Sequence, residues 1–358
     1  MGKRAGISQL LKAGFKRYLI DGLGGMALGL FTTLIVGLIL KQLGAITGLL
    51  PVVWFGSIAS VLTGAGIGMG VAHRFKVSPM VLYSSAVTGM MGAYAGKILS
   101  GAAFVEGNVV LIGPGEPLGA FIAAVVGIEF GRIVSGRTKL EIVLTPMATI
   151  LAGGTAGLLV GPGISAFMLW LGSLIVMATE QAPFIMGILV STMMGMALTL
   201  PISSAALSII LGLEGLAAGA ATVGCATQMI GFAVASYREN KMNGLLAQGL
   251  GTSMLQMPNI LRNPRVWIPP TVASALLGPL ATVVFKMANN PSGAGMGTSG
   301  LVGPLMTWST MAGSRPDSSL LLQILLLHFL LPAGLTLVIS ESMRKKNWIK
   351  PGDLRLDV

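Results

Sequence analysis

The sequence predicts an all-α polytopic membrane protein of about ten transmembrane helices with two re-entrant Gly-rich hairpins. Three observations predict this fold class. The mean hydropathy is +0.83 and only 10% of the residues are charged, against about a quarter in soluble domains. The charged residues gather between long apolar runs, and threading these runs alternately through a bilayer places most basic residues on one side. Lipid is therefore the expected solvent for most of the surface.

Ten apolar runs of 15 to 28 residues are candidates for spanning helices, which need roughly 20 residues for a hydrocarbon core about 30 Å thick. With 358 residues, ten such spans leave little chain for a soluble domain. The predicted spans are residues 20–40, 51–72, 79–96, 117–134, 142–160, 164–178, 184–211, 215–236, 269–287 and 319–339.

The basic residues predict the orientation of these spans. With the amino terminus in the cytoplasm, only four of the 23 Lys and Arg residues face outward: Lys41, Lys97, Lys286 and Arg315. The other nineteen lie inside, as the positive-inside rule requires, and an even number of spans returns the carboxyl terminus to the cytoplasm. We therefore expect a multi-pass membrane protein with both termini cytoplasmic. The rule also explains the net charge of +11 without nucleic acid as a partner.

The sequence predicts that the chain is divided into three regions. Residues 1–19 place apolar and basic side chains at helical spacing, which is typical of an amphipathic cytoplasmic helix on the inner leaflet. A merely basic cytoplasmic tail is the alternative. Residues 20–340 form the transmembrane domain, and residues 341–358 form a cytoplasmic tail. Glu129 precedes Arg132 by one helical turn, which predicts a local ion pair.

Few residues could carry covalent or metal chemistry. The single cysteine excludes an internal disulfide, and His73 and His328 are far apart in sequence and show no metal-ligand spacing. No two carboxylates show the spacing of a hydrolytic pair. We therefore expect no cofactor, no metal and no catalytic residue in this chain.

Two Gly-rich segments are too broken to span a membrane. The first, residues 241–269, is predicted to lie on the inner side, and the second, residues 289–314, on the outer side. Each contains Gly-Thr-Ser, which supplies Thr252 and Ser253 in the first and Thr298 and Ser299 in the second. Such segments can enter a membrane when their backbone is buried in protein or lines a wet cavity. An inner and an outer hairpin meeting near mid-membrane is the geometry of many transport sites, although the tripeptide repeat could also be chance.

The seventh predicted span contains a proline that should break its helix. Pro201 cannot donate to the helix ladder and disfavours helical geometry at the residue before it. The hydroxyls of Thr199, Ser203 and Ser204 flank this break and suit a polyhydroxylated or other neutral polar ligand. A simple proline kink, capped by these hydroxyls, is the competing interpretation.

Amide side chains provide the remaining candidate site residues. Gln228 lies within an apolar span and must find hydrogen-bond partners there. Gln256 and Asn259 flank Pro258 in the inner segment. An interhelical hydrogen bond for Gln228, and a structural turn for the other two, are the alternatives. Trp54, Trp267 and Trp348 are predicted at the membrane interfaces.

At these motifs the chain resembles the stand-alone enzyme IIC-like membrane subunits of the bacterial phosphoenolpyruvate-dependent sugar phosphotransferase system. The resemblance extends over nearly the whole chain. It is carried by MALGLF (26–31), GPGEPLGAFIAA (113–124), PFIMGILVST (183–192), MALTLPISSAA (196–206), the span 215–234, GLGTSMLQMPNI (249–260) and GMGTSGLVGP (295–304). The Glu- and His-containing sugar-site motifs of better-understood IIC subunits have no match here, so the resemblance transfers no site residue.

The resemblance implies a translocating subunit for a small polar solute, with a sugar expected. It also implies a place in the bacterial inner membrane, a separate cytoplasmic IIB-type partner and a homodimer. Two alternatives remain: a transporter or exporter not coupled to phosphorylation, and a membrane sensor or regulatory protein with the same fold.

Overall fold

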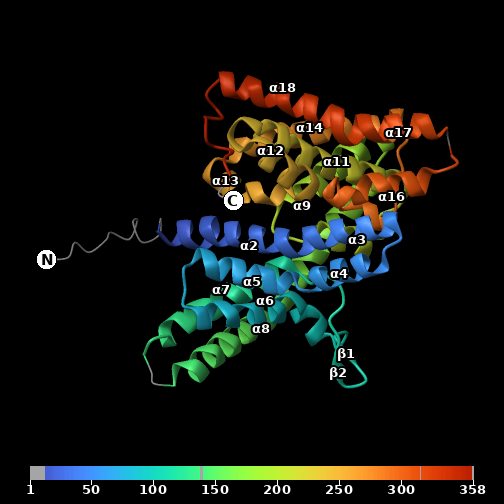
Figure 1. Ribbon diagram of the computed structural model, residues 1–358. Helices are drawn as coiled ribbons and strands as arrows, with labels where there is room; N and C mark the ends of the chain where they lie inside the picture. Colours follow the sequence, from blue (N-terminus) through green and yellow to red (C-terminus); the bar gives the residue numbers. More distant parts are fainter. Residues whose placement is uncertain (1–12, 138–139, 315, 357–358) are drawn as a thin grey trace. The chain divides into compact units, whose positions relative to one another are not determined.

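The computed structural model describes residues 13–137, 140–314 and 316–356 (Figure 1). Nearly all regular structure in these ranges is helical. The one sheet described there pairs β1 (Phe104–Val105) with β2 (Asn108–Val109) in antiparallel register. The chain forms two compact units. The first comprises the residues up to Leu34 and Ser57–Ser165, and the second comprises Ile35–Gly56 and Ala166–Val358.

Several helices are long and apolar enough to cross a bilayer, which confirms the all-α polytopic membrane fold. The described residues contain six such helices, or seven when the pair α4 (Leu50–Val61) and α5 (Thr63–Arg74), bent by 55°, counts as one span. The number ten stays a prediction, as do the cytoplasmic positions of both termini. The six helices cover Phe15–Thr47, Pro117–Val134, Glu141–Thr179, Gly215–Ala235, Pro264–Val284 and Asp317–Lys345.

The predicted interruption between the spans 142–160 and 164–178 is wrong. The predicted spans 142–160 and 164–178 form one continuous helix, α8 (Glu141–Thr179), which passes through Gly161-Pro162-Gly163 without a break. At 1.5 Å per residue, these 39 residues extend roughly 58 Å, nearly twice the hydrocarbon core. Gly161 serves packing here instead of a turn, because a Cβ on it would press against Ala95, whereas a Cβ at Gly163 would meet no atom within 4 Å.

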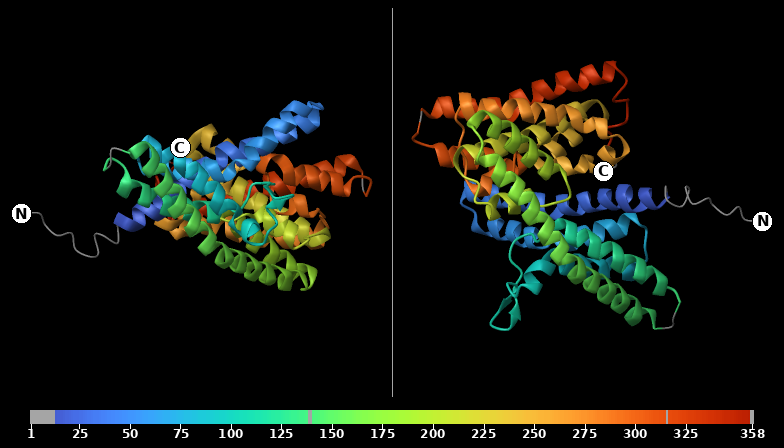
Figure 2. Two further views of the ribbon diagram at one scale, coloured as in Figure 1. Left: turned by 90° about the horizontal axis from the view of Figure 1, so that it is seen from below. Right: turned by 180° about the vertical axis from the view of Figure 1, so that it is seen from behind.

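The first unit is held together by close approaches between helix backbones. It contains η1 (Phe15–Asp21), α2 (Gly22–Leu30), α5, α6 (Pro79–Leu99), α7 (Pro117–Val134) and the first part of α8. A Cβ at Gly29 would collide with the carbonyl of Gly66, so α2 and α5 pack backbone to backbone, as small residues allow in membranes. In Figures 1 and 2 the β1–β2 hairpin projects away from the helices of this unit.

Residues 1–12 of the predicted amphipathic helix lie outside the described residues. From Phe15 the chain is helical without interruption into α2. Arg17 donates to Glu129 at 2.9 Å, and its guanidinium lies 4.3 Å from the ring centroid of Phe75. Glu129 also pairs with Arg132 at 2.6 Å, so the predicted ion pair is confirmed.

The second unit is built around α11 (Gly215–Ala235). In the most apolar stretch of this helix, 83% of the residues are buried. Helices α9 (Pro183–Thr199), α14 (Ile268–Pro279) and α18 (Leu331–Lys345) pack on it, and Leu277, Leu320 and Leu327 belong to its apolar core. The unit's other helices are η2 (Phe31–Ile35, from Ile35 on), α3 (Val36–Thr47), α10 (Ser204–Ile210), α12 (Tyr237–Leu246), α13 (Met257–Arg262), α15 (Pro291–Ala294), α16 (Val302–Met311) and α17 (Asp317–Leu325). Short π and 3₁₀ turns complete it: η3 (Ala247–Gly251), η4 (Ser253–Gln256), η5 (Pro264–Trp267), η6 (Leu280–Val284), η7 (Ser299–Leu301) and η8 (Leu326–Leu330).

Candidate functional site

The predicted break at Pro201 is present. Helix α9 ends at Thr199, Leu200 is extended (φ −71°, ψ 159°), and α10 begins at Ser204. Ser203 caps α10, since its Oγ accepts from the amide of Ala206 at 3.2 Å. The Ser204 hydroxyl donates to the carbonyl of Gly295 at 2.7 Å. Both serine hydroxyls therefore have structural bonds, local for Ser203 and to a distant segment for Ser204, whereas Thr199 takes part in a different contact.

Three of the predicted site residues converge at the end of α9. The Thr199 hydroxyl lies 2.7 Å from the Ser253 hydroxyl and 3.3 Å from Oε1 of Gln228. These side chains come from α9, η4 and α11, and each is fully buried. The structure thus brings the broken helix, the inner Gly-rich segment and the middle of α11 to one point.

Two further residues, Trp267 and Thr271, belong to this group of hydrogen-bonded side chains, and the sequence did not predict their part in it. The Trp267 indole Nε1 donates to Gln228 Oε1 at 3.0 Å, and Gln228 Nε2 donates to the Thr271 hydroxyl at 3.2 Å. The Thr271 hydroxyl in turn donates to the Trp267 carbonyl at 2.7 Å. Trp267 had been predicted at a membrane interface, and its spacing from Gln228 in the sequence gives no signal of this bond. We call Thr199, Gln228, Ser253, Trp267 and Thr271 the polar cluster.

The two Gly-Thr-Ser segments meet within the second unit. The Thr298 hydroxyl donates to the carbonyl of Gly249 at 2.5 Å, which joins the outer segment to the inner one. A Cβ at Gly297 would press on the backbone of Cys225, so the outer segment lies directly on α11. The Ser299 hydroxyl is buried and finds no hydrogen-bond partner among the described residues. Whether either segment re-enters a membrane stays a prediction.

The remaining predicted residues of the inner segment have internal partners. The Thr252 hydroxyl accepts from the amide of Met254 at 3.1 Å and caps η4. Gln256 Nε2 donates to Gln248 Oε1 at 2.8 Å, and Asn259 Nδ2 donates to Gln256 Oε1 at 2.8 Å. Gln256 and Asn259 therefore belong to a ladder of buried amides, separate from the polar cluster.

Comparison with protein families decides the identity of the fold. The model of the family described as phosphotransferase system, EIIC matches residues 20–356. The chain belongs to this EIIC family. No curated protein and no solved structure matches it. As an EIIC protein, it is a multi-pass inner-membrane sugar-transport subunit of the phosphotransferase system.

The polar cluster of this EIIC chain has hydrogen-bonding capacity to spare and no charge. Gln228 has two amide hydrogens and uses one, on Thr271. The Thr199 and Ser253 hydroxyls share one short bond, and each hydroxyl oxygen can still accept. The Gln228 amide and the Thr199 and Ser253 hydroxyls can therefore donate to and accept from the hydroxyls of a neutral sugar, whereas the Trp267 indole N–H is already used on Gln228.

Ser203 should matter for stability and not for the EIIC chain's solute. Replacing an N-cap serine with alanine costs about 1 kcal/mol, because one orphan amide at the helix start loses its acceptor. We expect Ser203→Ala to lower the melting temperature of the purified protein by a few degrees, while its affinity for a bound sugar is unchanged. A large loss of sugar affinity, measured by titration calorimetry, would place Ser203 in the binding site instead.

Proposed function

We propose that this EIIC chain binds a neutral sugar or polyol at the polar cluster and moves it through the membrane. The observation that carries the proposal is the contact of Thr199, Gln228 and Ser253, which joins three separate segments by uncharged groups. A buried charge would demand a charged partner, whereas hydroxyls and amides match sugar hydroxyls. The family membership supports a sugar as the solute class.

Access to the polar cluster requires motion. Thr199, Gln228 and Ser253 are each fully buried, so a solute reaches them only when a neighbouring segment moves. The break between α9 and α10 and the inner Gly-rich segment are the parts that can move without unwinding a long helix. Transport by this chain then alternates between the closed arrangement seen here and arrangements in which one of these segments has shifted.

Phosphorylation, in this proposal, takes place on a separate cytoplasmic IIB-type protein. The chain itself offers a binding site and a path, and a IIB-type protein would supply the phosphoryl group once the sugar arrives at the inner side. The basic residues of the inner loops, among them Arg262 and Arg265, would attract such a partner through complementary charge. We also propose that the chain works as a homodimer.

The experiment that tests the site uses the purified protein with a panel of solutes. Neutral hexoses, pentoses and polyols are compared with sugar acids and sugar phosphates by thermal shift and then by titration calorimetry. We expect at least one neutral sugar to raise the melting temperature and the charged analogues to have no effect. Stabilisation only by charged analogues would contradict a neutral site.

Thr199→Val is the variant that locates the sugar. Valine keeps the shape of threonine but removes the hydroxyl, which leaves Ser253 without its 2.7 Å partner. The loss of one hydrogen bond in a buried site corresponds to about 1–3 kcal/mol, so we expect affinity to fall by about fivefold or more. Ser203→Ala is the matched control, because its hydroxyl lies on the far side of the break. Equal affinities in both variants would exclude the polar cluster as the site.

A further inference from the structure

The last residues of the chain form a segment that is bound by side chains of the inner segment. After α18 ends at Lys345, residues 347–356 fold back onto the second unit, and we call them the C-terminal strap. Two apolar side chains anchor it, because Ile349 and Leu354 are each only 1% exposed. The strap is therefore part of the packed structure and not a free tail.

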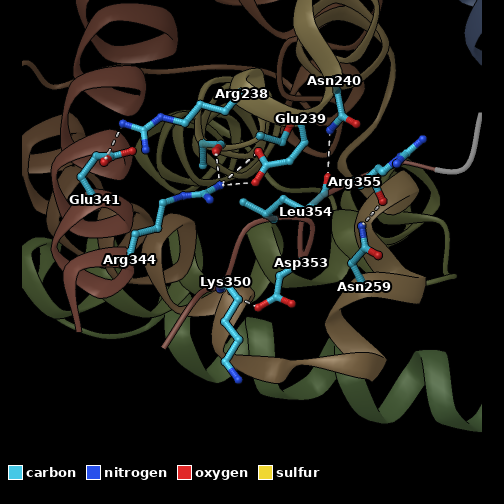
Figure 3. Close-up of polar contacts among 12 residues, drawn as sticks. Arg238, Glu239, Asn240, Asn259, Glu341, Arg344, Lys350, Asp353, Leu354 and Arg355 are labelled. Atoms are coloured by element: carbon cyan, nitrogen blue, oxygen red, sulfur yellow. Dashed lines mark hydrogen bonds and ion pairs between the residues drawn. The ribbon is translucent and has the colours of Figure 1, made fainter. Parts of the chain in front are cut away.

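Side-chain amides hold the backbone of the strap (Figure 3). Asn240 Nδ2 donates to the carbonyl of Leu354 at 2.8 Å, and Asn240 Oδ1 accepts from the amide of Leu356 at 2.8 Å. Gln256 Nε2 donates to the same Leu354 carbonyl at 3.1 Å, and Asn259 Nδ2 donates to the Arg355 carbonyl at 2.8 Å. These amides bond to backbone atoms of the strap. They therefore fix the path of its backbone and do not select its side chains.

A fourth amide side chain, that of Asn263, fixes the turn within the strap. Asn263 Nδ2 donates to the carbonyl of Trp348 at 3.1 Å and to Oδ2 of Asp353 at 2.8 Å. The same Asp353 oxygen accepts from the amide of Lys350 at 2.8 Å. Three of the amide side chains that hold the strap, those of Gln256, Asn259 and Asn263, belong to the inner Gly-rich segment. The strap is thus fastened to that segment at both of its ends.

The inner Gly-rich segment also provides one member of the polar cluster, Ser253. Gln256 ends the short helix η4 (Ser253–Gln256), and Ser253 begins it. One turn of helix therefore links the Leu354 carbonyl at one end to the Thr199 hydroxyl at the other. Outward movement of η4 that uncovers Ser253 while the strap stays in place would break the bond of Gln256 to the Leu354 carbonyl, and movement of the following α13 would break that of Asn259 to the Arg355 carbonyl.

We propose that the C-terminal strap is a latch that keeps the inner segment closed over the polar cluster, and that its release opens the cluster. The latch regulates the site of the proposed function, and its role in transport rests on that function. The opening itself can be measured without any sugar. Failure of the latch and failure of the sugar site are therefore separate results.

The test measures how fast a cysteine at the covered position reacts. In the full chain, Cys225→Ala removes the single native cysteine and Ser253→Cys provides a reporter that is buried in the closed state. A small maleimide is the probe, and the rate of labelling reports the open fraction. Ile349→Ser with Leu354→Ser removes both anchors of the strap. Lys350→Ser is the matched control, because the Lys350 side chain is exposed and only its backbone amide is used.

We expect the anchor variant to label about tenfold faster or more than the parent, and the control to label at the parent rate. Trypsin cleavage within the strap, after Arg355, shows directly whether the strap has been released, since the bond after Lys350 precedes Pro351 and resists trypsin. A released strap with an unchanged labelling rate would overturn the proposal, as would rapid labelling of the parent.

A milder variant keeps the test decisive if the anchor variant does not fold. Asn240→Asp removes the donor to the Leu354 carbonyl but keeps the acceptor for Leu356, and Asn240 lies outside the inner segment. We expect it to accelerate labelling by about twofold to tenfold, since a single half-buried hydrogen bond is lost. A labelling rate equal to that of the parent, with faster trypsin cleavage, would again overturn the latch.

Discussion

Gly224→Ala is expected to prevent the second unit from folding. A Cβ at Gly224 would collide with the carbonyl oxygen of Ser191, and a Cβ at Gly195 would press on Gly224 in return. The atoms in the way are backbone, so no side-chain rotation relieves the clash, and α9 and α11 must separate. Overpacking of this kind costs on the order of 3 kcal/mol or more. We expect loss of the monodisperse peak in size-exclusion chromatography, or a melting temperature many degrees lower.

Gly334→Ala is the control for this change. Gly334 lies on an exposed face of α18, where an added Cβ meets no atom within 4 Å. Alanine is the better helix former by up to about 1 kcal/mol, so the melting temperature should stay the same or rise. If both alanine variants behaved alike, the close packing of α9 on α11 would be wrong.

Arg344→Met is expected to destabilise the second unit strongly. Arg344 pairs with Glu239 at 2.9 Å and donates to the carbonyl of Ala235 at 3.1 Å, near the end of α11. Both charged side chains are only 9% exposed. Removing the arginine leaves the Glu239 carboxylate buried without its partner, which typically costs about 3–5 kcal/mol. The melting temperature of the purified variant measures this loss.

Two comparisons separate the ion pair from general damage. Glu239→Met added to Arg344→Met removes the stranded charge, so we expect the double variant to recover much of the lost stability. Arg238→Met breaks the exposed pair of Arg238 with Glu341, which should change stability by only about 0–1 kcal/mol. A double variant less stable than Arg344→Met alone would mean that Glu239 is stabilised by other groups.

The sequence predicted the elements whose limits are set by local chemistry. Pro117 and Val134 bound both the predicted span and the observed α7, because a proline begins the helix and polar residues follow its end. Pro201 marks the break after α9 for a similar reason, since a proline lacks the amide that a helix interior needs. Both signals lie within a few residues of the feature that they predict.

The sequence misled where the same residues serve two purposes. Gly-Pro-Gly at 161–163 is typical of a turn, yet in α8 Gly161 provides room for Ala95 of a neighbouring helix. Pro162 costs one backbone hydrogen bond, which a long helix tolerates when its neighbours pack well. Only the tertiary partner distinguishes the two uses.

Partners far apart in sequence could not be predicted either. Gln256 and Asn259 were singled out as polar groups that need partners, but nothing near them indicates that these include backbone carbonyls of Leu354 and Arg355. Thr199, Gln228 and Ser253 were named separately, and only the structure joins them. Their role in binding a sugar stays a prediction.

Sugar exchange across a lipid vesicle tests the central claim most directly, because it needs no phosphoryl donor. The protein is reconstituted into vesicles loaded with the unlabelled sugar found in the binding screen, and entry of the labelled sugar is followed. We predict saturable exchange by the wild type and by Ser203→Ala, and exchange reduced about fivefold or more by Thr199→Val, because in our proposal the Thr199 hydroxyl binds the sugar. Equal exchange by all three proteins, or none by the wild type, would contradict the account.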